Sequence, residues 1–164
     1  MTYGNMKKMK DFVEKYLKGR ENLRILEVGS LDLSKHGDWV FRRYFDKPNW
    51  EFIGLDIEAG RNVDVVSEHP YKYPYPDNVF DVVISGSTLE HVEDIYKITK
   101  EIARLSREYV VIMVPSQCPL HRHPIDCWRI MPDGMRFLLE EVAGLKVLEC
   151  GIIRKETFDI AKKV

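Results

Sequence analysis

The sequence predicts a doubly wound α/β fold built on a mostly parallel, Rossmann-like sheet. Continuous apolar runs occupy residues 80–85 and 109–114, a pattern typical of strands buried on both faces of a parallel sheet. Segments with apolar residues at helical spacing, over residues 5–19 and 87–107, alternate with these runs. Alternating strands and helices in one chain favour a parallel sheet covered by helices on both faces.

Each remaining element has its own signal along the chain. Residues 51–56 and 63–66 are strand-like runs, and the connection between them is too short for an ordinary crossover helix. Three prolines predict an irregular surface loop over residues 69–78. Ser87 and Glu90 have the spacing of a capping box, which would open the helix that follows. The other expected elements are a strand over 24–28, a helical or loop stretch near 32–46, a helix from about 133 to 142 that ends at Gly144, and a final hairpin of strands 145–153 and 157–163.

Length and composition indicate a single globular domain over residues 1–164. Hydrophobic residues make up 45% and charged residues 31% of the chain, which is the composition of a folded rather than a disordered protein. A net charge of −1 gives no general attraction to nucleic acid or to an anionic membrane, and no apolar run is long enough to cross a bilayer. Three widely spaced cysteines do not suggest a disulfide framework, so the sequence favours a reducing, cytoplasmic location.

Two of the predicted strands end in an acidic residue, and the first of these is followed closely by a glycine. The apolar run from Leu23 leads to Glu27 and Gly29, and the next run ends in Asp56. In a parallel sheet both acids would lie at the carboxyl ends of neighbouring strands, where such sheets bind ligands. Gly29 would let the backbone approach a ligand closely, and Asp56 could accept hydrogen bonds from ribose hydroxyls. The sequence therefore predicts a site for a nucleoside-containing cofactor.

The residues after Gly29 discriminate between cofactors. A nicotinamide site normally shows G-x-G-x-x-G, with a helix N-terminus at the pyrophosphate. Here residues 30–34 contain no glycine, and Asp32 would repel a pyrophosphate. An acid two residues before the glycine suits a cationic ligand better. With the runs 75–85 and 89–94 downstream, nearly the whole chain resembles the class I S-adenosylmethionine-dependent methyltransferases, which implies S-adenosyl-L-methionine as cofactor.

The resemblance also implies a seven-stranded sheet whose last strand is antiparallel, and it suggests roles around the cofactor. Glu27 would contact the methionine end, because a carboxylate buried at a strand end without a partner is costly. Ile57 would lie against the adenine face or else in the core, and Glu68 would either receive the adenine amino group or be solvated. Backbone carbonyls near Ser85 would face the ammonium group, and Gly86 would leave room for it. The expected cofactor-binding residues are Glu27, Gly29, Ser30, Asp56, Ile57, Glu68, Ser85 and Gly86.

The most chemically varied segment, residues 115–129, follows the fifth strand and should lie over the methyl-transfer face. It holds two histidines, two cysteines and an aspartate within ten residues, but their spacing matches no common zinc pattern, so no metal is predicted. A lid loop without chemistry is one interpretation. The favoured one is substrate recognition, with His121, His123 or Asp126 binding a hydroxyl or acting as a general base. His91 is expected either at the edge of this site or bonded to the backbone.

The sequence thus predicts an enzyme that transfers a methyl group to an oxygen or nitrogen of a small-molecule or sugar-like acceptor. Proximity and orientation should supply most of the acceleration. The stretch from His121 to Arg129 is similar to one in bacterial methyltransferases, including ones linked to glycan biosynthesis. The rival predictions are a module that binds the cofactor without turnover and a nucleotide- or nicotinamide-dependent enzyme, which the missing glycines disfavour. Leu31 and Leu33 stand where the family usually has glycines, and neither the acceptor nor the oligomeric state is indicated.

Overall fold

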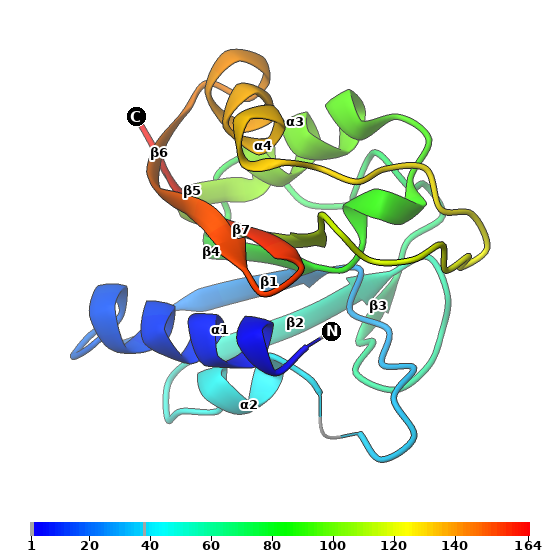
Figure 1. Ribbon diagram of the computed structural model, residues 1–164. Coiled ribbons are helices and arrows are strands. Elements are labelled where there is room, and N and C mark those ends of the chain that lie inside the picture. The colour runs from blue at the N-terminus through cyan, green and yellow to red at the C-terminus, as the bar shows by residue number, and fades with distance from the viewer. Residues whose placement is uncertain (1, 38) are drawn as a thin grey trace.

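The computed structural model describes residues 2–37 and 39–164 and contains one sheet of seven strands (Figure 1). The strands are β1 Arg24–Val28, β2 Glu51–Asp56, β3 Val65–Val66, β4 Phe80–Gly86, β5 Ser106–Pro115, β6 Leu145–Ile153 and β7 Glu156–Lys163. Their order in the sheet is β3-β2-β1-β4-β5-β7-β6. Strands β1 to β5 run parallel, and β7 is antiparallel to both of its neighbours. The predicted fold class, with an antiparallel last strand, is confirmed.

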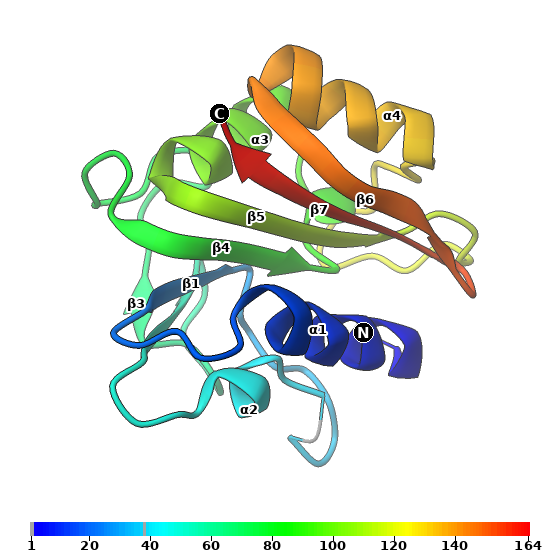
Figure 2. The ribbon, with the colours of Figure 1, turned by 90° about the vertical axis from the view of Figure 1, so that its left-hand side faces the viewer.

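Helices cover both faces of this sheet (Figures 1 and 2). The helical elements are α1 Tyr3–Tyr16, α2 Arg42–Phe45, η1 Leu89–His91, α3 Ile95–Leu105, α4 Pro132–Phe137 and η2 Leu138–Val142. Helices α1 and α2 lie on one face, and α3 and α4 lie on the other. Within the two described ranges, no helix combines the length and the apolar character needed to span a membrane.

The central strands send alternate side chains into two hydrophobic cores. In β1, Ile25 joins the core beneath α1 and α2, whereas Leu26 joins the core beneath α3 and α4. Val82 and Val83 divide between the same two cores in β4. Because both faces are covered, β1, β4 and β5 are buried over most of their length, which explains why they read as continuous apolar runs.

The segment after β4 differs from the single helix predicted over residues 87–107. Ser87 has a φ of 55° and Thr88 makes no capping bond, so the chain forms only the short turn η1 before it extends again. The long helix α3 begins after Asp94, whose carboxylate accepts the amide of Lys97 at 3.0 Å. The capping-box prediction was wrong because Asp94, rather than Ser87, caps this helix. As a result η1 stays at the carboxyl edge of the sheet, where it can contribute to a site.

Most other predicted elements are present with shorter bounds. Helix α1 ends at Tyr16, before Gly19, which adopts a left-handed φ of 75°. In the stretch 32–46 only α2 is helical, and Asp38 lies outside the described residues. Strand β3 is limited to two residues, and the last turn after α4 widens into η2 before Gly144, at a φ of 67°. The final hairpin forms as predicted.

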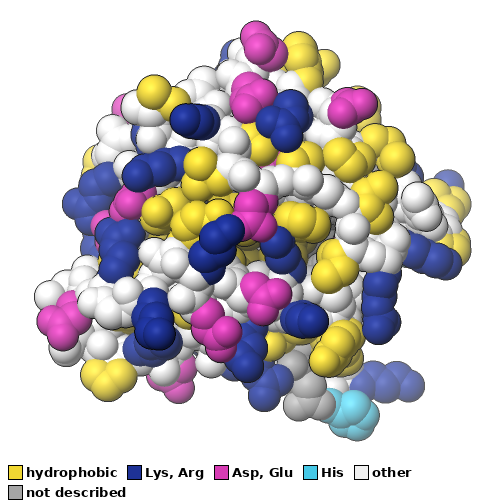
Figure 3. Space-filling view, turned by 60° about the vertical axis from the view of Figure 1, so that its left-hand side comes forward, with side chains coloured by type: hydrophobic (Ala, Val, Ile, Leu, Met, Phe, Trp, Pro, Cys, Tyr) yellow, Lys and Arg dark blue, Asp and Glu magenta, His cyan; other side chains and the backbone are white. Residues whose placement is uncertain are grey.

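Charged side chains of both signs are mixed over the surface. In Figure 3, lysine and arginine side chains stand among aspartate and glutamate side chains across the face shown. Glu149 of β6, for example, pairs with Lys8 and Lys15 of α1 at 2.6 and 2.7 Å. Lys15 is exposed, and exposed pairs are worth about 0–1 kcal/mol each. The mixture agrees with the net charge of −1.

Candidate functional site

A cavity of about 790 Å³ opens at the carboxyl edge of the sheet. Its walls come from the segments that follow β1, β2, β4 and β5, the position at which parallel sheets bind ligands. We call one side the strand-end half, formed by Glu27, Gly29, Ser30, Asp56, Ile57 and Asn62. The other side is the loop half, formed by Glu90, His91, Cys118, His121, His123 and Glu156.

Glu27 lies near the end of β1 and is only 1% exposed. The side-chain amide of Asn62 donates to Glu27 Oε2 and to the backbone carbonyl of Ser30, both at 2.8 Å. Burial raises the pKa of Glu27 to about 8, because the single bond from Asn62 only partly offsets the loss of water. A cation in the cavity would favour the ionised carboxylate and would bind to it.

Asp56 ends β2 beside the end of β1, because Val28 and Leu55 are partners in the parallel register. Its carboxylate organises the neighbouring loop: Oδ2 accepts the amide of Leu31 at 2.9 Å, and Oδ1 accepts the amide of Ile57 at 2.8 Å. A carboxylate has about four lone-pair sites, so Asp56 can still accept hydrogen bonds from a ligand. The two acid-ended strands thus meet at one edge of the sheet, as the sequence predicts.

Gly29 is required by the packing of the protein itself. Its φ of 74° lies in the left-handed region that favours glycine. A Cβ atom at this position would lie 2.0 Å from Oγ1 of Thr88, so the absent side chain allows the loops after β1 and β4 to pack together. Packing against Thr88 is thus a second reason for this glycine, and the approach of the cofactor to its backbone stays a prediction. Its backbone still lines the cavity.

Packing also explains the small residues at the end of β4. A Cβ atom on Gly86 would lie 2.5 Å from the ring of Phe41, so this glycine makes room for a buried aromatic residue. Ser85 is fully buried, and its hydroxyl donates to the carbonyl of Val28 at 2.9 Å. The side chain of Ser85 thus ties β4 to β1, and the bare Cα of Gly86 admits Phe41. The expected contact between the backbone carbonyls of this segment and an ammonium group stays a prediction.

The three other predicted cofactor residues have different surroundings. Ser30 is buried, and its hydroxyl has no partner among the described residues. Ile57 is half exposed and lines the cavity, so it offers an apolar surface and is not a core residue. Glu68 is exposed and lies outside the cavity, because Ser67 takes the inward position and donates to the carbonyl of His69 at 2.8 Å. The geometry therefore gives Glu68 no contact with the site.

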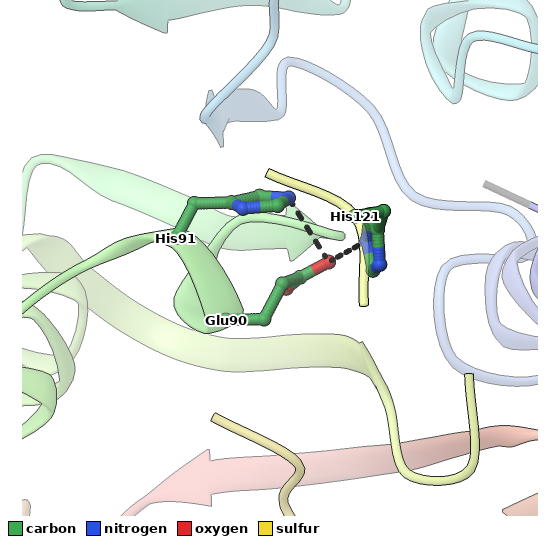
Figure 4. Close-up of side chains that lie close together, drawn as sticks. All are labelled: Glu90, His91 and His121. Atoms are coloured by element: carbon green, nitrogen blue, oxygen red, sulfur yellow. Dashed lines mark ion pairs between the residues drawn. The ribbon is translucent and has the colours of Figure 1, made fainter. Parts of the chain in front are cut away.

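Glu90 is a buried acid of the loop half that lies beside two histidines (Figure 4). It lies in η1 with no exposed surface, and neither carboxylate oxygen has a hydrogen-bond partner among the residues described. Its Oε1 lies 3.7 Å from Nε2 of His91 and 3.8 Å from Nε2 of His121. Burial raises the pKa of Glu90 to about 8 and lowers the pKa of His91. A buried carboxyl group without a partner is costly, and a ligand can relieve that cost.

The loop over residues 116–129 is fastened by its own aspartate, tryptophan and arginine. Arg129 forms a two-pronged ion pair with Asp126, at 2.5 and 2.6 Å, and also donates to three carbonyls of the loop. The indole of Trp128 donates to the carbonyl of Val92 at 2.8 Å, which ties the loop to the segment after η1. The Arg129 guanidinium holds the pKa of Asp126 well below its usual range. An aspartate held in this way is a weak base, so Asp126 fits a positioning role.

Three histidines gather around η1. His121 and His123 line the cavity, and their ring centroids lie 5.1 and 6.2 Å from that of His91. His91 combines the two roles that the sequence left open. Its Nδ1 bonds to the carbonyl of Ile125 at 2.6 Å, while its Nε2 faces Glu90.

The sequence analysis missed three residues of the cavity, namely Asn62, Thr88 and Glu156. Asn62 adopts a left-handed φ of 69°, which is common for asparagine in loops and gives no hint of its bond to a buried acid. Glu156 begins β7, is buried, and lies 3.8 Å from the sulfur of Cys118. Glu90 was noticed only as part of a capping box. None of these roles follows from spacing along the chain.

Comparison with known sequences identifies one family. The sequence model of a family described as "Methyltransferase domain" matches residues 20–113, which is more than half of the chain. The match runs from before β1 into β5 and so includes the ends of both acid-bearing strands. No curated protein sequence matches the chain.

Solved structures share the fold at low sequence identity. A SAM-dependent methyltransferase from Aquifex aeolicus has a TM-score of 0.68 and 16% identity, with 100% of both chains covered. The 1,6-didemethyltoxoflavin-N1-methyltransferase of Burkholderia thailandensis, solved with S-adenosylhomocysteine, has a TM-score of 0.71 and 14% identity, with 97% of this chain and 78% of that chain covered. The cyclase SpnF has a TM-score of 0.67 and 14% identity over 96% of this chain and 80% of its own. At these identities the likeness establishes the fold.

Proposed function

Because the chain belongs to the methyltransferase domain family of class I S-adenosylmethionine-dependent enzymes, we propose that it methylates an oxygen or nitrogen of a small-molecule or sugar-like acceptor. Its cofactor is S-adenosylmethionine. The observation that supports the proposal is that one cavity joins the strand-end half to the loop half. A cofactor in the first half and an acceptor in the second would be held close together, which is the main requirement of in-line methyl transfer.

The strand-end half fits this cofactor in charge and polarity. When bound, S-adenosylmethionine supplies a methyl group that its sulfonium has already activated. Glu27 offers a buried carboxyl group to the ammonium, and Asn62 holds that carboxyl group in place. Asp56 offers carboxylate oxygens to the ribose hydroxyls, and the unpartnered hydroxyl of Ser30 can bond to a further polar atom. Ile57 provides an apolar surface for the adenine ring.

The loop half favours an acceptor that donates hydrogen bonds. Glu90 and Glu156 are both buried there with unpartnered carboxylate oxygens, and such oxygens attract hydroxyl or amino groups. We assign the role of general base to His123, which lines the cavity and is exposed to it. His123 would accept the proton of an acceptor hydroxyl while the new bond to carbon forms.

The ion pair of Asp126 with Arg129 gives the acceptor loop its shape in this proposal. The pair fixes the segment that carries His121 and His123, and the bond from Trp128 fixes the segment against η1. A glycan-type acceptor is the narrower form of the proposal. It is supported by the similarity of the stretch from His121 to Arg129 to bacterial methyltransferases linked to glycan biosynthesis.

A module that binds the cofactor without methyl transfer is the second candidate function. The cyclase SpnF has the same fold, and a shared fold does not by itself specify the reaction. This candidate predicts normal binding of S-adenosylhomocysteine with no acceptor-dependent turnover. The methyltransferase proposal predicts both.

The test is to incubate the protein with S-adenosylmethionine and a panel of sugars, small alcohols and small amines, and to measure formation of S-adenosylhomocysteine. We expect formation that depends on the acceptor and falls by about 10²–10⁴-fold in His123→Ala. Binding of S-adenosylhomocysteine without turnover on any acceptor would favour the binding module. Failure to bind S-adenosylhomocysteine at all would contradict both functions.

A further inference from the structure

Glu90, His91 and His121 together have the geometry of a metal site (Figure 4). Their ligand atoms all lie within 4.8 Å of one another, and Glu90 Oε1 is 3.7 and 3.8 Å from the two Nε2 atoms. In a tetrahedral zinc site, bonds of about 2.0–2.1 Å separate neighbouring ligand atoms by about 3.3–3.4 Å. Each carboxylate–imidazole separation therefore exceeds the ligated value by only a few tenths of an ångström.

Backbone carbonyls fix the tautomers of both imidazoles. Nδ1 of His91 lies 2.6 Å from the carbonyl of Ile125, and Nδ1 of His121 lies 3.0 Å from the carbonyl of Pro119. Since a carbonyl oxygen only accepts hydrogen bonds, both Nδ1 atoms must carry a proton. In the neutral rings the Nε2 atoms then hold free lone pairs, and both face Glu90. A hydrogen bond from the second ring nitrogen to a carbonyl is the usual support of a metal-binding histidine.

Arg129 is near His121, but its contacts leave the Nε2 atom free. Its Nη2 lies 3.4 Å from His121 Nδ1, yet the same nitrogen donates to the carbonyl of Pro119 at 2.9 Å and to Asp126 at 2.6 Å. The positive charge of Arg129 is therefore balanced by Asp126. The Nε2 side of the ring faces the uncompensated acid Glu90.

Glu90 Oε1 and the two Nε2 atoms face one another, and while both rings are neutral at most one proton, that of the Glu90 carboxyl group, is available among them. One proton could bridge Glu90 to one imidazole, but the other lone pair would still have no partner. A divalent cation would satisfy all three atoms at once, and two imidazoles with one carboxylate are a familiar ligand set of catalytic zinc. We propose that Glu90, His91 and His121 bind a divalent transition-metal ion of the zinc type, with an open coordination position toward the cavity.

The surroundings of the cluster also favour a cation. Glu156 is a second buried acid in the loop half, and its Oε2 has no partner among the described residues. The loop is locked onto η1 by the amide of Cys127, which donates to the carbonyl of Glu90 at 2.7 Å. The ligands are therefore held by elements that are bonded to each other. The site joins two adjacent residues of η1 to one loop histidine, which explains why the spacing within the loop matches no zinc pattern.

An open position on this ion would face the cavity whose strand-end half is proposed to bind the cofactor. If the proposed methyl transfer is correct, this position would bind an acceptor hydroxyl and lower its pKa, as zinc does for bound water. Metal binding itself does not depend on that role. It can be tested on protein for which no acceptor is known.

The experiment uses the full chain after removal of any histidine tag. Zinc content is measured by elemental analysis, and Zn²⁺ affinity is measured on the chelator-treated protein by competition with a chromophoric chelator. Co²⁺ is added in parallel, because its visible absorption reports the coordination geometry. Variants Glu90→Gln and His121→Ala remove one ligand each. His123→Ala is the matched control, since it removes a histidine from the same loop that is not one of the three ligands.

We expect about one zinc ion per chain and a four- or five-coordinate Co²⁺ spectrum for the wild type and for His123→Ala. Glu90→Gln and His121→Ala should bind Zn²⁺ more than about 100-fold more weakly, since outer-shell changes alone cost 10–100-fold. Retained S-adenosylhomocysteine binding would show that these variants are folded. If these variants do not fold, the wild type alone tests the proposal: a four- or five-coordinate Co²⁺ spectrum supports the site, and its absence overturns it. Absence of Zn²⁺ and Co²⁺ binding in the wild type would overturn the proposal, as would equal loss in His123→Ala and His121→Ala.

Discussion

Glu27 and Asp56 owe their positions to the ladder between β1 and β2, whereas Glu90 and His121 owe theirs to a loop bonded to a short turn. The strand-end half therefore rests on regular structure with covered faces. The loop half rests on a small number of side-chain and carbonyl bonds, chiefly those of Arg129. Because of this difference, we expect substitutions in the two halves to change different measured properties of the protein. The strand-end half should govern cofactor affinity, and the loop half should govern turnover.

The largest expected effect is that of Gly29→Ala in the strand-end half. A left-handed φ costs a non-glycine residue about 1–2 kcal/mol, and contact with Thr88 adds overpacking of about 1–3 kcal/mol. Gly19→Ala is the matched control, because Gly19 has nearly the same φ, 75°, but nothing within 4 Å of its Cβ position. Urea unfolding should show a clearly larger decrease in the free energy of unfolding for Gly29→Ala than for Gly19→Ala. Equal losses in the two variants would remove the role assigned to Thr88.

Asp56→Ala should weaken S-adenosylhomocysteine binding by about 1–3 kcal/mol, because it removes the acceptor of the Leu31 amide and the proposed acceptor of the ribose hydroxyls. Glu68→Ala is the control, since Glu68 is exposed and outside the cavity. Calorimetric titration of both variants compares the cofactor affinity lost at a residue that lines the cavity with that lost at a residue outside it. Weakened binding in Glu68→Ala would restore the contact originally expected for that residue.

Arg129→Ala should lower turnover while leaving cofactor affinity nearly unchanged. The loop would lose its ion pair and its bonds to three carbonyls, and misplacement of a reacting group by about 1 Å can cost about 100-fold in rate. Arg129→Lys should rescue only part of this loss, because lysine cannot form the two-pronged pair with Asp126. Steady-state kinetics with an acceptor would measure the effect. A large change in S-adenosylhomocysteine affinity would show that the two halves are not separable.

The smallest expected effect is the change in cofactor affinity over a single pH unit. Burial raises the pKa of Glu27 to about 8, so the free protein holds this group neutral below that pH, whereas an ammonium ligand favours the ionised form. Affinity for S-adenosylhomocysteine should therefore rise with pH up to about 8, by at most about tenfold per unit. Without ligand, pH has the opposite effect on stability. The free energy of unfolding falls as pH rises from about 4.5 to about 8, because the folded protein binds the Glu27 proton more tightly than the unfolded chain does. Glu27→Gln should flatten the rise in affinity, and a parallel slope in both proteins would exclude Glu27 as its source.

Sequence reasoning worked best where position follows from regular structure. The apolar runs before Glu27 and Asp56 fixed both the strands and the edge at which they end, so the two acids could be placed without coordinates. The reasons for Gly29 and Gly86 could not be found in this way. Their close neighbours, Thr88 and Phe41, are distant in the sequence and meet them only in the folded sheet.

The loop half was harder to predict for a related reason. Asp126 and Arg129 looked like chemical groups, but each satisfies the other and shapes the loop. Glu90 looked like a helix cap, because its spacing from Ser87 fits that motif. Ser87 instead has a left-handed φ, and the extended backbone at Val92 ends the turn and leaves Glu90 at the cavity. A local backbone conformation of this kind is set by tertiary packing and has no clear sequence signal.

The most direct test of the account compares Asp56→Ala and His123→Ala in one experiment. S-adenosylhomocysteine affinity and acceptor-dependent turnover are measured for both variants and for the wild type. The account predicts that Asp56→Ala loses affinity, whereas His123→Ala binds S-adenosylhomocysteine as the wild type does and loses turnover. Loss of affinity in His123→Ala equal to that in Asp56→Ala would contradict the division of the cavity into a cofactor side and an acceptor side.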